Sequence, residues 1–285
     1  MAPLVGPHDE DFSDFYTNWM KTQEDLLKDL HKAVENNAEE TELSRKVDGV
    51  LANYDIYYEA KQNACHQDIL RTVSPEWKSP LEKAFLWLGG WRPSLAFQLV
   101  YALTGQMTEV ELAEFFEGIE SPGLSSLSAS QLSEISELQT STNKQEDFLG
   151  DEMAMLQQSF ADQPLLSLAQ AHHLVQAQEA KNDSHMHDMH DDGSAQQNIG
   201  DAEQSRNDTN EPDSSNDALD SAMQEKLNHL QTIAAKADNL RLTTLKGVLN
   251  ILNTFQKAQY LVAAGKLQML VWNIGEKLTG ATASL

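Results

Sequence analysis

A helix start placed directly before the least polar part of the chain constrains this fold most. Ser79 can cap the helix with its hydroxyl group, and Pro80 suits the first helical position, where no backbone N–H is needed. Glu82 lies where its carboxylate can reach back to the cap. Apolar side chains then follow on nearly every face as far as Leu88, a pattern typical of a helix enclosed by other helices. We therefore predict an enclosed helix over residues 79–88.

Two glycines interrupt this apolar stretch. Gly89 and Gly90 permit the left-handed backbone conformation that closes a helix. Pro93 and Ser94 then favour a new helix start, and apolar residues continue to Tyr101. We therefore predict a helical hairpin at the centre of the fold.

Helical periodicity recurs on both sides of this hairpin. Apolar residues return at steps of three and four in residues 12–34, 41–70, 108–118, 131–160, 223–255 and 258–272. A strand would need clean alternation of apolar and polar side chains, and no segment of the sequence has it. The sequence therefore predicts an all-α fold, a multi-helix bundle built around the central hairpin.

The apolar residues between Leu132 and Phe160 form a narrow seam on an otherwise polar helix. Such a seam needs a second helix to cover it. The same monomer or a second copy of the chain could supply that helix, so a homodimer stays open as an alternative.

The composition changes completely between residues 179 and 220, where Asp, Asn, Ser, Gln and Gly dominate and large apolar residues almost vanish. Such a segment cannot bury enough apolar surface to offset the entropy of ordering it. We predict a disordered acidic insertion there, a disordered leader at 1–10 and a flexible tail at 276–285. The rest of 11–275 is predicted to be a single helical domain.

The charge balance is strongly acidic, with 20 Lys and Arg against 44 Asp and Glu and a net charge of −24. A DNA-binding surface needs clustered basic residues to replace counterions, and no such run occurs. Cys65 is the single cysteine, so no internal disulfide can form. No apolar run reaches the length of a membrane span. We expect no direct nucleic-acid or membrane contact and a location in the nucleus, the cytoplasm or both.

Catalytic motifs are absent from the sequence. It has no nucleophile elbow, no phosphate-cradling loop and no His-Glu-x-x-His arrangement. We therefore predict no catalytic residues and no cofactor.

A histidine-rich stretch lies inside the predicted insertion. His185, His187 and His190 lie close to Asp188, Asp191 and Asp192, and imidazole and carboxylate groups together can chelate a divalent transition metal. Without a preorganised shell such binding is weak. We therefore favour a solvated linker, with these three histidines as weak metal candidates.

Several blocks of sequence resemble the delay-of-germination (DOG) domain of plants. The blocks cover residues 41–43, 47–54, 77–82, 87–94 and 237–241. The motif residues are Trp77, Pro80, Trp87, Gly89, Gly90, Arg92, Pro93, Asp238, Asn239, Leu240 and Arg241. The same domain forms the C-terminal half of TGA bZIP transcription factors and occurs alone in seed-dormancy regulators.

The resemblance implies a helical, non-enzymatic regulator that acts by protein contacts in transcription-linked signalling, such as seed dormancy, abscisic-acid response or development. The partners it implies are type 2C protein phosphatases and bZIP transcription factors. TGA factors read DNA with a basic region and zipper before this domain, whereas a short acidic leader precedes Phe12. We therefore expect no direct DNA binding by this chain alone, and a sequence-specific DNA-binding factor that acts through a bZIP partner stays an alternative.

In the dormancy branch an Asp-x-Tyr-x-x-Trp pattern is associated with phosphatase docking. Asp14, Tyr16 and Trp19 have that spacing. The two aromatic residues lie three apart on one helical face, where they are either an aromatic contact for a partner or part of the core. Both hypotheses fit the spacing, and the core is favoured because periodic aromatic residues on a first helix are usually internal.

Some members of the dormancy branch carry two histidines four residues apart on the last helix, proposed as haem ligands. Gln268 and Trp272 occupy the corresponding positions. Neither side chain suits haem iron, so the resemblance predicts no haem at this site. A small-ligand sensor is the main alternative to a protein-contact regulator, because a helical core with an apolar last helix could enclose a lipid or a porphyrin such as haem.

Overall fold

The computed structural model describes residues 12–104, 127–161, 167, 170 and 211–282. Within these ranges the secondary structure is helical, apart from one isolated β-bridge, so the predicted all-α class is confirmed. The helices are α1 (Phe12–Glu35), α2 (Glu40–Gln67), α3 (Ile69–Val73), α4 (Pro80–Ala84), α5 (Leu95–Leu103), α7 (Ala129–Gln158), the 3-10 helix η1 (Ser159–Ala161), α9 (Glu211–Ile251) and α10 (Thr254–Thr282).

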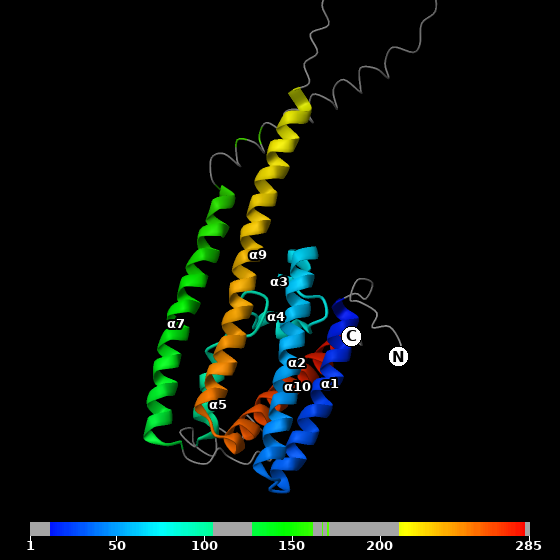
Figure 1. The fold of residues 1–285 in the computed structure, drawn as a ribbon. Coiled ribbons are helices and arrows are strands. Elements are labelled where there is room, and N and C mark those ends of the chain that lie inside the picture. Colours follow the sequence, from blue (N-terminus) through cyan, green and yellow to red (C-terminus); the bar gives the residue numbers. More distant parts are fainter. Residues whose placement is uncertain (1–11, 105–126, 162–166, 168–169, 171–210, 283–285) are drawn as a thin grey trace, which may run out of the picture. The chain divides into compact units, whose positions relative to one another are not determined.

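The chain divides into two compact units, residues 1–152 with 231–285, and residues 153–230. The first unit contains α1 to α5, most of α7, the second half of α9, and α10 (Figure 1). The second contains the end of α7, η1 and the first half of α9. The core and the site described below both lie in the first unit.

Amphipathic periodicity explains the packing of α1 and α2. On α1 the buried residues include Trp19, Leu27, Leu30 and Val34, which repeat at helical spacing on one face. Asn37 lies in the short connection between α1 and α2 and has a φ of 49°, a left-handed conformation that asparagine tolerates. The predicted amphipathic first helix is confirmed.

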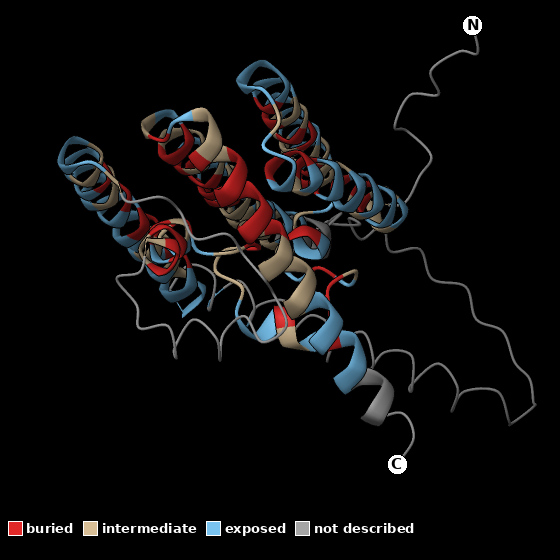
Figure 2. Ribbon diagram, turned by 90° about the horizontal axis from the view of Figure 1, so that it is seen from below, coloured by how far each residue is buried: buried red, intermediate tan, exposed pale blue. Residues whose placement is uncertain are grey.

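Helix α10 lies against α1, α2, α4 and α5. Its first half is buried on most sides, from Ala258 to Ala263. Gly265 brings it close to α1, because a Cβ at this position would overlap the side chain of Leu27. Beyond Gly265 the side chains become half-exposed, and Trp272 is 36% exposed. The prediction of a core helix over 258–272 therefore holds for its first half, while burial decreases along the second (Figure 2).

The apolar seam predicted over Leu132 to Phe160 is covered within the chain only in part. In the first unit, Ile135 is fully buried and Leu149 packs with Ala237 and Leu240 of α9. Phe148, which was predicted in the seam, is instead 58% exposed beside Lys236. The homodimer that the seam left open stays a prediction.

The helix predicted over residues 79–88 is shorter in the structure. Its start has the expected capping box, but α4 ends at Ala84, and Phe85 is 62% exposed. Residues 87–90 form a tight turn with an antiparallel bridge between Trp87 and Gly90. The chain cannot continue as a helix to Leu88, because Leu88 and Gly89 have positive φ angles that a right-handed helix does not allow.

Other predicted segments are only partly described. The leader, the helix over 108–118 and the histidines of the insertion lie outside the described residues. Helix α9 begins at Glu211 and α10 continues to Thr282, inside the ranges predicted as insertion and tail, so the domain boundaries stay predictions. Among the described helices, none has the length and apolar character needed to span a bilayer.

Candidate functional site

A cavity of about 320 Å³ lies between α1, α2, α5, α9 and α10 in the first unit. We call it the aromatic cavity, because its walls include Tyr16, Trp19, Tyr54, Tyr57, Tyr58, Trp91 and Tyr260. Charged side chains line it as well: Lys61, Lys78, Arg92, Asp238 and Arg241. Residues far apart in the sequence therefore meet around one space.

Aromatic side chains from α1 and α2 form one wall of the cavity. The ring centroids of Trp19 and Tyr57 are 4.6 Å apart, and those of Trp19 and Tyr54 are 5.8 Å apart. Trp19 Nε1 donates a hydrogen bond of 2.8 Å to the carbonyl of Asn53, which satisfies its polar edge. Burial raises the pKa of Tyr54 to about 12, so this wall is uncharged at neutral pH.

A buried charge cluster, defined as Lys61, Asp238 and Arg241, lies at the side of the cavity. Lys61 Nζ donates to Asp238 Oδ1 at 2.8 Å and to the carbonyl oxygen of Gly89 at 2.9 Å. Arg241 Nη1 donates to the same Asp238 oxygen at 2.5 Å. Lys61 is 2% exposed and Arg241 is 6% exposed. Burial lowers the pKa of Lys61 to about 8; the charge of Asp238 opposes this effect and that of Arg241 adds to it.

Arg241 also holds the turn that follows α4. Its Nε donates to the carbonyl of Trp91 at 2.7 Å, and its Nη2 donates to the carbonyls of Leu88, at 3.1 Å, and Trp87. The fork of the guanidinium group suits this convergence of acceptors. Backbone φ angles of 47° at Leu88 and 73° at Gly89 mark a type I′ turn.

Gly90 is required by the closeness of the arginine. A Cβ on Gly90 would lie 2.7 Å from both Cζ and Nε of Arg241. The motif glycines were predicted to end a helix. The structure corrects this: Gly89 supplies a positive φ in a tight turn, and Gly90 makes room for Arg241.

A second buried ion pair, between Lys78 and Glu82, contacts Tyr16 of α1 at the cavity wall. Lys78 Nζ donates to Glu82 Oε1 at 2.9 Å and to the hydroxyl oxygen of Tyr16 at 3.1 Å. Glu82 Oε2 accepts from the backbone and side chain of Ser79, so the same carboxylate completes the capping box of α4. Interactions with Tyr16 and Glu82 outweigh the effect of burial and raise the pKa of Lys78. This pair therefore carries no excess charge.

The predicted docking residues fall into two groups. Tyr16 and Trp19 are 3% and 4% exposed and line the aromatic cavity, as the core hypothesis requires. Asp14 is exposed on the surface of α1. The docking role of the three residues stays a prediction.

Five of the eleven predicted motif residues meet at the buried charge cluster. Trp87, Gly89, Gly90, Asp238 and Arg241 meet directly there. The others lie nearby or support the fold: Arg92 and Pro93 line the cavity, Pro80 begins α4, Trp77 packs on Phe12, Leu240 is in a small core cluster, and Asn239 is exposed.

Of the positions compared with haem-binding relatives, Gln268 lines the aromatic cavity and donates to Met20 Sδ at 3.5 Å, whereas Trp272 is partly exposed. The histidines considered for metal lie outside the described residues. Within the described part of the chain, no group of three or more His, Cys, Asp or Glu side chains could hold a metal ion.

Sequence reasoning missed the contribution of α2 to the site. Tyr54, Tyr58 and Lys61 lie at steps of four and three, so they share one helical face with a lysine among tyrosines. A lysine on an otherwise aromatic helix face is the signal that could have identified this part of the site, because a lysine is seldom buried without a partner.

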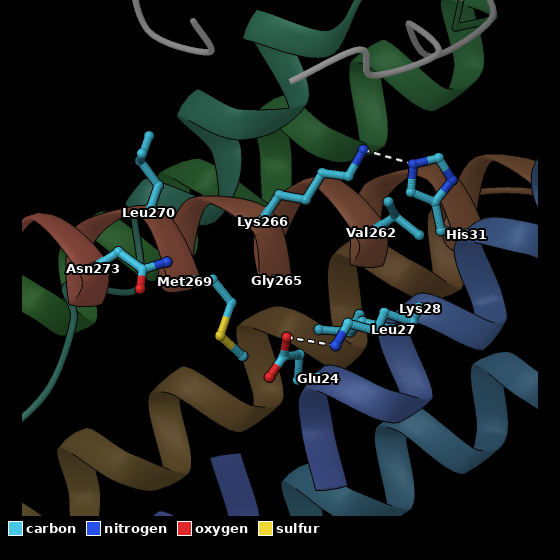
Figure 3. Close-up of a pocket in the computed structure, with 10 residues that line it drawn as sticks. All are labelled: Glu24, Leu27, Lys28, His31, Val262, Gly265, Lys266, Met269, Leu270 and Asn273. Carbon is cyan, nitrogen blue, oxygen red and sulfur yellow. Dashed lines mark hydrogen bonds and ion pairs between the residues drawn. The ribbon is translucent and has the colours of Figure 1, made fainter. Parts of the chain in front are cut away.

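A second hollow of about 340 Å³ lies between α1 and α10 (Figure 3). Its rim carries an ion pair of 2.6 Å between Glu24 and Lys28, and Lys266 Nζ donates to His31 Nε2 at 2.7 Å. The Lys28 and Glu24 side chains are 59% and 47% exposed, so solvent screens their charges. We call this hollow the α1–α10 groove.

Comparisons with known proteins agree with the resemblance found in the sequence. The family model DOG1, described as seed dormancy control, matches residues 26–102. Protein DOG1-like 3 of Arabidopsis thaliana is 25% identical over 263 residues, which cover 89% of this chain and 80% of that protein. Transcription factor TGA5 of the same plant is 34% identical over 147 residues, or 52% of this chain. The match spans only 38% of the length of TGA5.

Proposed function

The chain is related to the DOG1 seed-dormancy-control family, and from that premise we propose that it is a non-enzymatic regulator acting by protein contacts in transcription-linked plant signalling. The observation that carries the proposal is the match to residues 26–102. That segment contains α2 to α5 and the turn held by Arg241. Its relatives include DOG1-like proteins and TGA transcription factors, and control of seed dormancy, abscisic-acid response or development is the specific role proposed here.

We propose that the first helix presents the partner contact. Tyr16 and Trp19 are buried, so their role in docking is to anchor α1 rather than to touch the partner. Asp14 is exposed on the same helix and is the residue proposed to contact it. The partner is a type 2C protein phosphatase, with a TGA-type bZIP factor as the alternative.

The test is a direct binding measurement by biolayer interferometry with a purified phosphatase and a purified TGA factor. Asp14→Lys should weaken binding by about tenfold, or about 1.4 kcal/mol, because a charge at the contact is reversed. Asp29→Lys is the matched control, since Asp29 is also exposed on α1 and changes the net charge equally. Equal loss in both variants would remove Asp14 from the contact. Absence of binding by the unaltered chain to both proteins would overturn the protein-contact proposal.

A small-ligand sensor is the second candidate function, and the aromatic cavity is the observation that favours it. Its volume of about 320 Å³ lies at the lower end of the range of small-molecule sites, about 300–1,000 Å³. Native mass spectrometry of protein purified from a plant host should detect a bound lipid, porphyrin or other small molecule as a mass excess. A spectrum with only the bare chain would remove the support for a resident ligand.

A further inference from the structure

The charges around the aromatic cavity do not balance. Lys78 is paired with Glu82 at 2.9 Å, and Arg92 is paired with Glu146 at 2.8 Å. In the buried charge cluster, however, the two cations Lys61 and Arg241 share a single carboxylate, Asp238. Among the described residues, no other ion pair involves either cation. The wall of the cavity therefore carries one excess positive charge, in a chain whose net charge is −24.

Backbone carbonyls compensate this charge only in part. They accept hydrogen bonds from Lys61 and from Arg241, but each contributes a dipole and not a full charge. A buried cation without a full counter-charge is unfavourable, since it has lost its hydration. The lowered pKa of Lys61 agrees with this incomplete compensation. An anion entering the cavity would supply the missing charge.

The other walls of the aromatic cavity suit a ligand that contains an aromatic ring. Tyr54, Tyr57, Trp91 and Tyr260 line the cavity from different elements, and aromatic faces and edges pack well against other rings. The volume of about 320 Å³ favours a compact molecule. Leu95, which is 47% exposed, also lines the cavity, so the space reaches solvent on that side.

We propose that the aromatic cavity binds a compact aromatic organic anion, whose carboxylate or sulfonate lies against Lys61 and Arg241 while its ring packs among the tyrosine and tryptophan side chains. This inference rests on the second candidate function, a ligand sensor, and names the chemistry of its ligand. The excess positive charge favours an anionic group on the ligand, and the aromatic walls favour an aromatic ring.

The test compares two fluorescent probes with similar ring bodies, using the full chain. 1-Anilinonaphthalene-8-sulfonate is an anion, and N-phenyl-1-naphthylamine is its uncharged counterpart. The anion should bind at least about tenfold more tightly than the neutral probe. Equal affinity would overturn the anion preference but leave a ligand sensor standing. Absence of binding by both probes would overturn the inference and the sensor candidate together.

A substitution then removes the excess charge of the cluster. Lys61→Met should weaken binding of the anionic probe by about tenfold or more. It should not change the affinity of the neutral probe by more than about twofold. The matched control is Lys28→Met, in the α1–α10 groove (Figure 3), which should leave both affinities unchanged. An equal loss in Lys28→Met would assign the probe to the groove and overturn the proposal.

Measuring the affinity of both probes as a function of pH needs no substitution, so it tests the proposal even if a variant does not fold. Lys61 loses its proton near pH 8, whereas the sulfonate stays charged. Affinity for the anionic probe should therefore fall between about pH 7 and pH 9.5, with no change for the neutral probe. An unchanged affinity for the anion would overturn the proposal. The titratable or charged side chains near Lys61 are Tyr57, Tyr58, Cys65, Lys78, Asp238 and Arg241.

Discussion

Gly90 shows how a single residue can be required by a contact far away in the sequence. Its backbone lies so close to Arg241 that a Cβ has no space. Arg241 in turn uses its guanidinium group to bind Asp238 and the carbonyls of the turn. The absence of a side chain at residue 90 therefore allows α9 to hold the connection between α4 and α5.

We predict that Gly90→Ala destabilises the fold by about 1–3 kcal/mol, because the added methyl group forces Arg241 or the turn to move. Gly150→Ala is the matched control, since nothing lies within 4 Å of a Cβ there and the residue is inside α7. That control should stabilise the chain by about 0.5–1 kcal/mol. Urea denaturation of both variants measures the difference. A neutral Gly90→Ala would show that the turn can shift at little cost.

Lys61 should make stability depend on pH. Its pKa is about 8 in the folded chain against an ordinary value of 10.5, so between these values the unfolded chain binds more protons at this residue. Stability due to Lys61 therefore rises with pH through that window and is constant below it.

We predict that the free energy of unfolding has a more positive slope between pH 8 and 10.5 in the unaltered chain than in Lys61→Met. Urea titrations at several pH values measure both slopes, and the comparison removes the effects of other titrating groups. Parallel slopes would contradict the lowered pKa of Lys61.

Helix α4 is only five residues long, and its stability depends on its cap. Glu82 serves the cap and the buried Lys78 at once, while Lys78 also reaches Tyr16 of α1. One carboxylate therefore links the start of α4 to the wall of the aromatic cavity.

We predict that Glu82→Gln destabilises the fold by about 3–5 kcal/mol, because it leaves the charge of Lys78 buried without its partner. Glu76→Gln is the matched control. Glu76 forms an exposed pair with Arg71 at 3.5 Å, and its loss should cost less than about 1 kcal/mol. Thermal denaturation followed by circular dichroism distinguishes them. A similar loss of stability in the two variants would mean that solvent reaches Lys78.

At the scale of the whole molecule, charge decides how the protein can meet DNA. A chain with 44 acidic and 20 basic residues is repelled by the phosphate backbone unless its basic residues cluster. The exposed lysines Lys28 on α1 and Lys236 on α9 form ion pairs with glutamates, so they do not add up to a basic surface. A role in transcription would then depend on a DNA-binding partner.

We predict that the protein alone does not retard a DNA duplex carrying a TGA site at about 0.1 M salt, because it lacks an excess of cations to replace counterions. A purified TGA factor is the positive control. If the chain acts through such a bZIP partner, the mixture should migrate more slowly than the TGA complex alone. Retardation by the chain by itself would contradict this view of its charge.

The helices themselves could be predicted because their signals are local. The cap at Ser79 and the apolar spacing of α1 depend on residues within a few turns of one another, and both are confirmed. The resemblance to the DOG domain was also readable from motif blocks, and it agrees with the family match.

The sequence by itself determined the all-α class, the start of α4 and the amphipathic faces, because helix formation depends on near neighbours. Only the tertiary structure decided that Lys61 meets Asp238 across 177 positions, that residues 87–90 turn instead of continuing a helix, and that Tyr16 and Trp19 line a cavity. Those features depend on which helix faces pack together. Packing between distant segments therefore created the candidate site from residues whose local patterns predicted only helices and turns.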